Sequence, residues 1–156
     1  MNMQESMNET LNDLVMINND RIAGYEKAIA DLKSLDIDLK AIFEQMKTQS
    51  MVYKEDLKKI IEETGGIVEV GTTSAGKIYR AWMEIKSTFS ESDRLSVLAA
   101  CEFEENATLR AYEAALLSGT ILNIAVQALV EEQTAALKKS SDLIKNERKA
   151  HAALQN

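Results

Sequence analysis

The chain contains no proline among its 156 residues and only six glycines. Because tight turns depend on these two residue types, a chain of many short strands is disfavoured and long helices are favoured. The single cysteine, Cys101, cannot form an internal disulfide, which agrees with a reducing compartment. A chain of this length is expected to form one domain, residues 1–156, with a sizeable core.

Basic residues and long apolar runs are scarce as well. The chain has 18 Lys and Arg against 25 Asp and Glu, a net charge of −7. Such an acidic balance disfavours nonspecific binding to nucleic acid or to an anionic membrane. No apolar stretch reaches the ~18 residues that cross a bilayer, and the N-terminal region lacks the pattern of a secretory signal. We therefore expect a cytoplasmic protein with neither a nucleic-acid partner nor a membrane partner.

What the chain does have is apolar residues at helical spacing. The pattern predicts four long helices over residues 7–34, 37–64, 92–118 and 121–150, and a shorter helix over 74–89. Ser6 and Glu9 have capping-box spacing, and Gly65 and Gly119 are natural helix stops. Short links predict two antiparallel hairpins, and the long link with the short helix predicts a crossover along the bundle.

One stretch of sequence occurs twice, 87 positions apart. Tyr25 and Glu26 match Tyr112 and Glu113, and the same offset carries residues 39–44 onto 126–131. The two helical hairpins therefore read as related copies, an internal duplication. Together with the helix pattern, the repeat predicts an all-α fold, an antiparallel four-helix bundle with a long connection between its second and third long helices.

Three segments of the chain carry a family resemblance. The segments 11–28, 76–82 and 101–116 are similar, in order and spacing, to a bacterial family of ferritin-like four-helix bundles catalogued as a domain of unknown function. The resemblance spans about residues 10–149. It implies a ferritin-like bundle of paired hairpins and no established activity, because a fold does not transfer a mechanism.

The glutamates of the repeat are candidate metal ligands. Ferritin-like bundles of the di-iron class need an inward Glu on each of two helices and a Glu-x-x-His on each of the other two. Glu44 is followed three positions later by lysine and Glu131 by threonine, so both histidines are missing. Glu26 and Glu113 fall at the flanks of their apolar stripes. We predict four solvated glutamates and no stoichiometric iron or zinc.

A different polar set points inward. Asn18 and Glu105 lie 87 positions apart, and both fall at the centre of their apolar stripes. In an antiparallel bundle Asn18 is expected at the height of Ser50 and Tyr53. Glu105 is expected at the height of Ser140. The full predicted polar layer is Asn18, Ser50, Tyr53, Glu105, Gln133 and Ser140.

We interpret this set as a hydrogen-bonded layer that fixes the helix register, with Glu105 satisfied by hydroxyls, a lysine or water. The alternative is the remnant of a metal layer, in which Glu105 and Asn18 would be the ligands. One inward carboxylate without histidine offers too few donors for a di-metal site.

Four other sequence features are expected to have structural roles or none. Residues 71–77 have phosphate-loop spacing, but Ile78 stands where a hydroxyl should reach magnesium, so we expect an ordinary loop. Trp82 is expected to seat the short helix on the bundle. Cys101 lies on an apolar stripe and is expected to be a buried, inert thiol. His151 is expected to be exposed in a fraying tail.

Three function classes follow. The first is a non-catalytic bundle without a cofactor that acts by binding, including self-association as a homodimer. The second is an iron- or manganese-binding ferritin-like protein in iron or oxidative-stress handling. The third is a small-ligand binder at the inter-helix polar layer. The sequence assigns no catalytic and no cofactor-binding residue.

Overall fold

The computed structural model describes residues 1–33, 36–68 and 94–155. Four helices fill these ranges: α1 Met3–Asp31, α2 Ile37–Glu63, α4 Arg94–Leu117 and α5 Ile124–Gln155. No strand occurs within the described residues. The predicted all-α bundle of four long helices is confirmed. The predicted short helix over 74–89, Trp82 and the loop at 71–77 lie outside the described residues.

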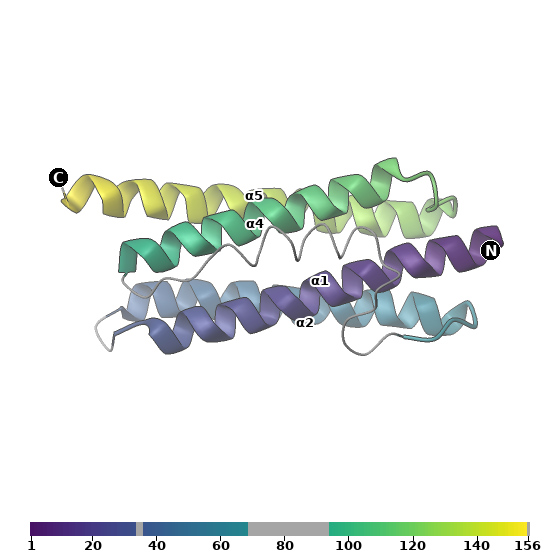
Figure 1. Cartoon of the computed structure of the whole chain (residues 1–156), viewed down its shortest axis with the longest axis horizontal. Helices are drawn as coiled ribbons and strands as arrows, with labels where there is room; N and C mark the ends of the chain where they lie inside the picture. Colours follow the sequence, from purple (N-terminus) through teal and green to yellow (C-terminus); the bar gives the residue numbers. More distant parts are fainter. Residues whose placement is uncertain (34–35, 69–93, 156) are drawn as a thin grey trace.

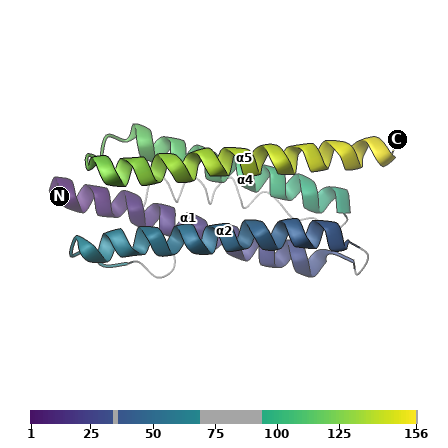
Figure 2. The ribbon, with the colours of Figure 1, turned by 180° about the vertical axis from the view of Figure 1, so that it is seen from behind.

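The helices pair as two antiparallel hairpins, α1 with α2 and α4 with α5 (Figure 1). Seen from behind, α2 and α5 lie in front of α1 and α4 (Figure 2). The two hairpins meet mainly where α1 packs on α4. Helix α2 ends and α4 begins at opposite ends of the bundle (Figure 1), as the predicted lengthwise crossover requires. None of the helices in the described part of the chain is long and apolar enough to cross a membrane.

Helix α1 begins earlier than predicted, because Asn2 caps it. The Asn2 side chain accepts a hydrogen bond from the Glu5 backbone N–H at 2.8 Å and donates one to the Glu5 carboxylate at 2.9 Å. The backbone N–H of Ser6 already donates to the Asn2 carbonyl. The predicted capping box at Ser6 is therefore wrong, and Asn2 caps the helix one turn earlier.

Both predicted glycine stops are confirmed. Gly65 and Gly119 have φ values of 76° and 74°, in the left-handed region that a glycine adopts without steric cost. Helix α5 begins later than predicted, at Ile124, because the Asn123 side chain caps it through the Val126 N–H at 3.1 Å. It also continues to Gln155, beyond its predicted end.

The core consists of two apolar clusters separated by polar residues on every helix. One cluster includes Leu11, Leu14, Leu57, Ile61, Val130 and Leu137. The other includes Tyr25, Leu39, Phe43, Leu98 and Ile144. Each fully buried side chain of this size contributes about 1.5–3 kcal/mol to folding. Between the clusters, the four helices bring Arg21, Ser50, Glu105 and Ser140 inside the bundle. These residues locate the candidate site.

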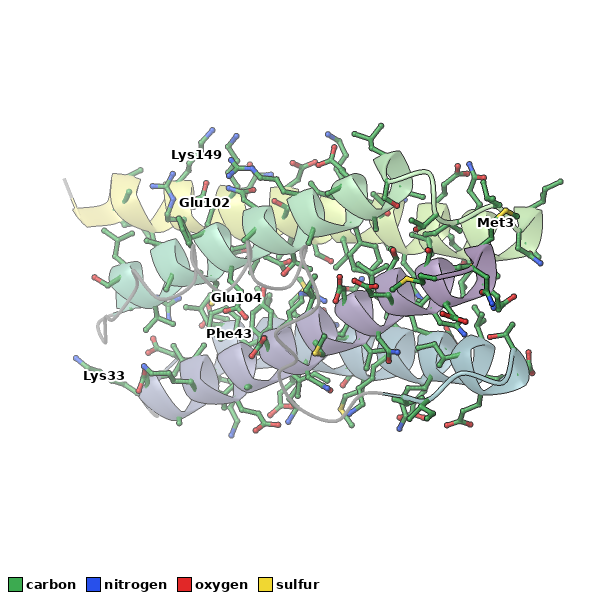
Figure 3. The ribbon with its side chains drawn as sticks, turned by 45° about the vertical axis from the view of Figure 1, so that its right-hand side comes forward. Met3, Lys33, Phe43, Glu102, Glu104 and Lys149 are labelled. Carbon is green, nitrogen blue, oxygen red and sulfur yellow. The ribbon has the colours of Figure 1, made fainter. Side chains whose placement is uncertain are left out.

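Helices α1 and α4 approach closely at Gly24. A Cβ atom at this position would lie 2.6 Å from Cδ of Glu104, so a larger residue requires the Glu104 side chain to move. Figure 3 shows Glu104 on α4 beside α1. The glycine therefore lets the two hairpins meet one turn away from the polar residues.

Candidate functional site

The centre of the bundle holds a buried ion pair between α1 and α4. Nη2 of Arg21 lies 2.6 Å from Oε1 of Glu105, and Nε lies 3.2 Å from Oε2. Both side chains have an exposed fraction of 0%. The guanidinium thus contacts both carboxylate oxygens in the forked geometry that suits an Arg–carboxylate pair.

The remaining donors of Arg21 reach α2. Nη1 donates to Oγ of Ser50 at 2.8 Å and to the Met46 backbone carbonyl at 3.3 Å. Nη2 also lies 3.5 Å from the Met46 sulfur. A guanidinium has five N–H donors. The three contacts to α2 and the two to Glu105 give each of them an acceptor. One side chain therefore joins α1, α2 and α4.

Tyr25 completes the shell of Glu105. Its hydroxyl donates to Oε1 at 2.6 Å, and its ring lies 5.4 Å from the guanidinium carbon of Arg21. Burial raises the pKa of Tyr25 well above the ordinary tyrosine value, and the charge of Glu105 raises it further. Burial is the largest single influence on the pKa of Arg21 and lowers it, but Glu105, Tyr25 and Glu104 together raise it by more, so the pKa of Arg21 is raised. Both groups are held in their protonated forms.

A second, neutral set of hydrogen bonds lies next to the ion pair. Nδ2 of Asn18 donates to the Leu14 carbonyl and to the Tyr112 hydroxyl, each at 2.8 Å. The Tyr112 hydroxyl donates in turn to Oε1 of Gln133 at 2.7 Å. Nε2 of Gln133 lies 3.5 Å from the Tyr53 backbone carbonyl. Burial raises the pKa of Tyr112. This set crosses α1, α4, α5 and α2.

One buried atom of the neutral set, Oδ1 of Asn18, accepts no hydrogen bond from any residue that the structure describes. The amide orientation is fixed by Leu14, because the carbonyl of Leu14 can only accept and therefore requires the NH₂ group on its side. The unpartnered acceptor is thus a property of this geometry.

Five of the six predicted layer residues are buried, and the sixth, Tyr53, is half-buried. Their hydrogen bonds group them differently from the prediction. Ser50 bonds to Arg21 and so belongs with Glu105, whereas Asn18 connects to Gln133 through Tyr112. Ser140 donates to Oε1 of Gln49 at 3.0 Å, between α5 and α2.

Arg21 was missing from the predicted layer. It lies three residues after Asn18 and four before Tyr25, so its place on the inward face was readable from spacing. A long cationic side chain is rarely buried, and this preference hid it. Glu105 was predicted to be satisfied by hydroxyls, a lysine or water. In the structure its partners are the Tyr25 hydroxyl and the guanidinium of Arg21.

A family model described as "Domain of unknown function (DUF2383)" matches residues 6–118, well over half of the chain. The chain belongs to this family. Among solved structures, a Mycobacterium smegmatis Dps1 mutant is similar to it, with a TM-score of 0.81 and 14% sequence identity. The similarity covers 94% of this chain and 97% of that one. No curated protein matches the sequence. The ferritin-like fold of this DUF2383 member is confirmed, and at this identity the likeness carries the fold alone.

The donor set of this DUF2383 member does not fit a ferritin-like metal centre. Within the described residues, no three His, Cys, Asp or Glu side chains gather as a metal-binding group. Both oxygens of Glu105 face the guanidinium of Arg21, whose positive charge stands beside the carboxylate. A divalent cation at Glu105 would have to displace that charge, and Asn18 offers it only one amide oxygen.

The repeat glutamates lie outside the layer. Glu26, Glu113 and Glu131 are exposed, and Glu44 is half-buried and pairs with Lys47 of its own helix at 3.3 Å. None of these four lies in the buried layer.

Cys101 lies in the core near the ion pair, with an exposed fraction of 3%. Burial raises the pKa of its thiol, and the charges of Glu104 and Glu105 raise it further. A thiol in this state is a poor nucleophile.

The predicted exposure of His151 is wrong. Its side chain has an exposed fraction of only 13%, and Nε2 lies 2.5 Å from Nη2 of Arg94 at the start of α4. The helix remains formed to Gln155, so the histidine is held against the bundle. The sequence pattern does not reveal this contact, because it pairs residues 57 positions apart that meet only when α4 and α5 lie side by side.

Proposed function

We propose that this DUF2383 member is a non-catalytic helical bundle that acts by binding protein, with a second copy of itself as the partner. The observation that carries the proposal is the buried ion pair of Arg21 with Glu105, in which every N–H donor of the guanidinium already has an acceptor. The charged groups of the layer hold three helices together, so they are not available as an acid, a base or a metal ligand. The acidic balance and the buried thiol support a cytoplasmic setting.

Exposed apolar side chains support the binding role. At one end of the bundle, α1 begins, α4 ends and α5 begins (Figure 1). Leu117, Leu122 and Ile124 there have exposed fractions of 87%, 58% and 85%. Met3, at the same end in Figure 3, has an exposed fraction of 69%. Apolar side chains gathered at one end of a molecule are typical of protein contact surfaces.

Sedimentation across a range of protein concentrations tests this proposal. We expect the native chain to dimerise and the Leu117→Lys/Ile124→Lys variant to remain monomeric. Ile37→Lys is the matched control, because Ile37 has an exposed fraction of 73% but lies at the other end of the bundle. A monomeric native chain at every concentration, or equal loss of dimer in the control, would contradict self-association through this end.

The iron or manganese alternative rests on the ferritin-like fold alone. Elemental analysis of protein from cells grown with added iron or manganese separates it from the proposal. We expect less than one metal ion per ten chains, because Arg21 already neutralises the buried carboxylate. One or two metal ions per chain would overturn the non-catalytic assignment in favour of metal handling.

One observation favours the small-ligand alternative. The unpartnered Oδ1 of Asn18 would accept a hydrogen bond from a small molecule that carries an N–H or O–H group. A crystal structure at high resolution tests it. Ordered electron density larger than a water molecule beside Oδ1 would support a ligand, whereas a single water or none would leave the layer with a structural role.

A further inference from the structure

At the end of the bundle where α4 begins, one arginine joins three helices. Arg94, the first residue of α4, contacts the carboxylate of Asp36 at the start of α2 and lies 2.8 Å from Oδ2 of Asp38 in the first turn of α2. Its Nη2 lies 2.5 Å from Nε2 of His151 near the end of α5. Arg94 therefore tethers the last turns of α5 to α4 and α2.

The hydrogen bonds fix the protonation state of His151 in this arrangement. Nδ1 lies 2.6 Å from the Glu147 backbone carbonyl, which can only accept, so Nδ1 carries the proton. The guanidinium of Arg94 can only donate, so Nε2 must offer a lone pair. The contact therefore requires the neutral imidazole with its proton on Nδ1.

Protonation of His151 removes its contact with Arg94 and strengthens its contact with Glu147. A proton on Nε2 would point at the guanidinium, leaving two donors and two positive charges face to face. The charged ring has a partner on its own helix, because Oε2 of Glu147 lies 3.9 Å from Nδ1. Arg94 keeps its two aspartates, and its hydrogen bond to Asp38 lowers the pKa of that carboxyl. Each protonation state of His151 thus has its own partner.

We propose that His151 is a pH-dependent latch that holds the last turns of α5 on α4 while it is neutral and releases them when it is protonated. The charged groups around it are Arg94 of α4, Asp36 and Asp38 of α2, and Glu147 of α5. The ion pair of Arg148 with Glu102 lies about one turn before His151 on α5 and joins that part of the helix to α4.

Hydrogen exchange of the backbone amides of residues 151–155, corrected for intrinsic rates, tests the latch. His151 is the only histidine of the chain, so its ring signals in NMR report the same titration without overlap. Because a partly exposed contact of this kind is weak, we expect the opening of these residues to increase about two- to fivefold as the ring becomes protonated. Amides at the centre of α5 should not respond.

Two variants isolate the mechanism. His151→Gln keeps an acceptor for Arg94 but cannot titrate, so exchange of the last turn should become independent of pH. Arg94→Gln removes the cation, so the last turn should already exchange faster at neutral pH and change little on acidification. An equal response to acid in the native chain and in His151→Gln would overturn the latch, as would an Arg94→Gln variant that behaves like the native chain.

Discussion

The two tyrosines of the repeated stretch occupy matching positions, but their surroundings differ in charge. Tyr25 of α1 bonds to Glu105 of α4, and Tyr112 of α4 bonds to Asn18 of α1. Each member of the first pair lies 87 positions from its counterpart in the second. The same inter-hairpin contact is therefore made twice, once with a carboxylate and once with an amide.

The cation explains the difference. The counterpart of Arg21 in the second hairpin is Thr108, whose hydroxyl bonds to the Glu104 carbonyl of its own helix at 2.9 Å. Arg21 lies opposite the carboxylate of Glu105. In the second set, threonine stands at the position of the arginine, and the amide of Asn18 stands at the position of the carboxylate. Charge thus occurs in this layer as a pair. The neutral set shows that this inter-hairpin contact also forms without charge, whereas a buried carboxylate requires a positive partner.

Removing one charge should have the largest effect. Arg21→Met leaves Glu105 buried with only the Tyr25 hydroxyl, and we expect a loss of about 3–5 kcal/mol in the free energy of unfolding. Chemical denaturation measures it. The double variant Arg21→Met/Glu105→Leu removes both charges and should recover most of the loss, because an apolar pair needs no partner.

The neutral set supplies the matched control. Asn18→Leu removes the amide at the position that corresponds to Glu105, and we expect a cost of about 1 kcal/mol. A single Arg21→Met variant no less stable than Asn18→Leu would mean that the carboxylate of Glu105 reaches water once the guanidinium is gone. The distinction between the two sets would then be lost.

The two tyrosine hydroxyls should differ in the same direction by a smaller amount. Tyr25→Phe removes a donor to a charged carboxylate and should cost about 1.5–3 kcal/mol. Tyr112→Phe removes neutral bonds to Asn18 and Gln133 and should cost about 0.5–1.5 kcal/mol. Both changes keep the ring, so unfolding free energies compare the hydroxyls alone. Equal costs would argue that water reaches the carboxylate of Glu105.

The fold could be predicted from the sequence because its signals are periodic and redundant. Apolar spacing, Gly65 and Gly119 each indicated the same helices, and the 87-residue offset tied the two hairpins together. The helix ends were less predictable. The Ser6 box and the Asn2 cap satisfy the same local rule, so the local pattern alone does not decide where the helix begins.

The site was predictable in part for a related reason. Asn18 and Glu105 stand at the centres of apolar stripes, where a polar residue is conspicuous. The identity of the group that neutralises Glu105 is a tertiary fact, because it depends on which long side chain of a neighbouring helix reaches inward. His151 and Arg94 illustrate the same limit, since residues 57 positions apart meet only after the hairpin has folded.

The smallest expected effect compares Tyr25 of the charged set with Tyr112 of the neutral set at alkaline pH. The pKa values of Tyr25 and Tyr112 are raised by burial, so the folded chain keeps two protons that the unfolded chain releases near pH 10. The stability they contribute is therefore complete below about pH 10 and declines above it, by at most about 1.4 kcal/mol per pH unit for each tyrosine. Unfolding free energies measured at several alkaline pH values give this slope. Cys101 and Tyr53, whose pKa values are also raised, add to the same slope. Each Tyr→Phe variant should therefore lower the slope by the share of one tyrosine, and the double variant should remove both shares. The share of Tyr112 should reach its end at a lower pH than that of Tyr25, because Tyr25 bonds to a carboxylate that holds its proton and Tyr112 bonds to amides. Shares that end at the same pH would contradict this difference.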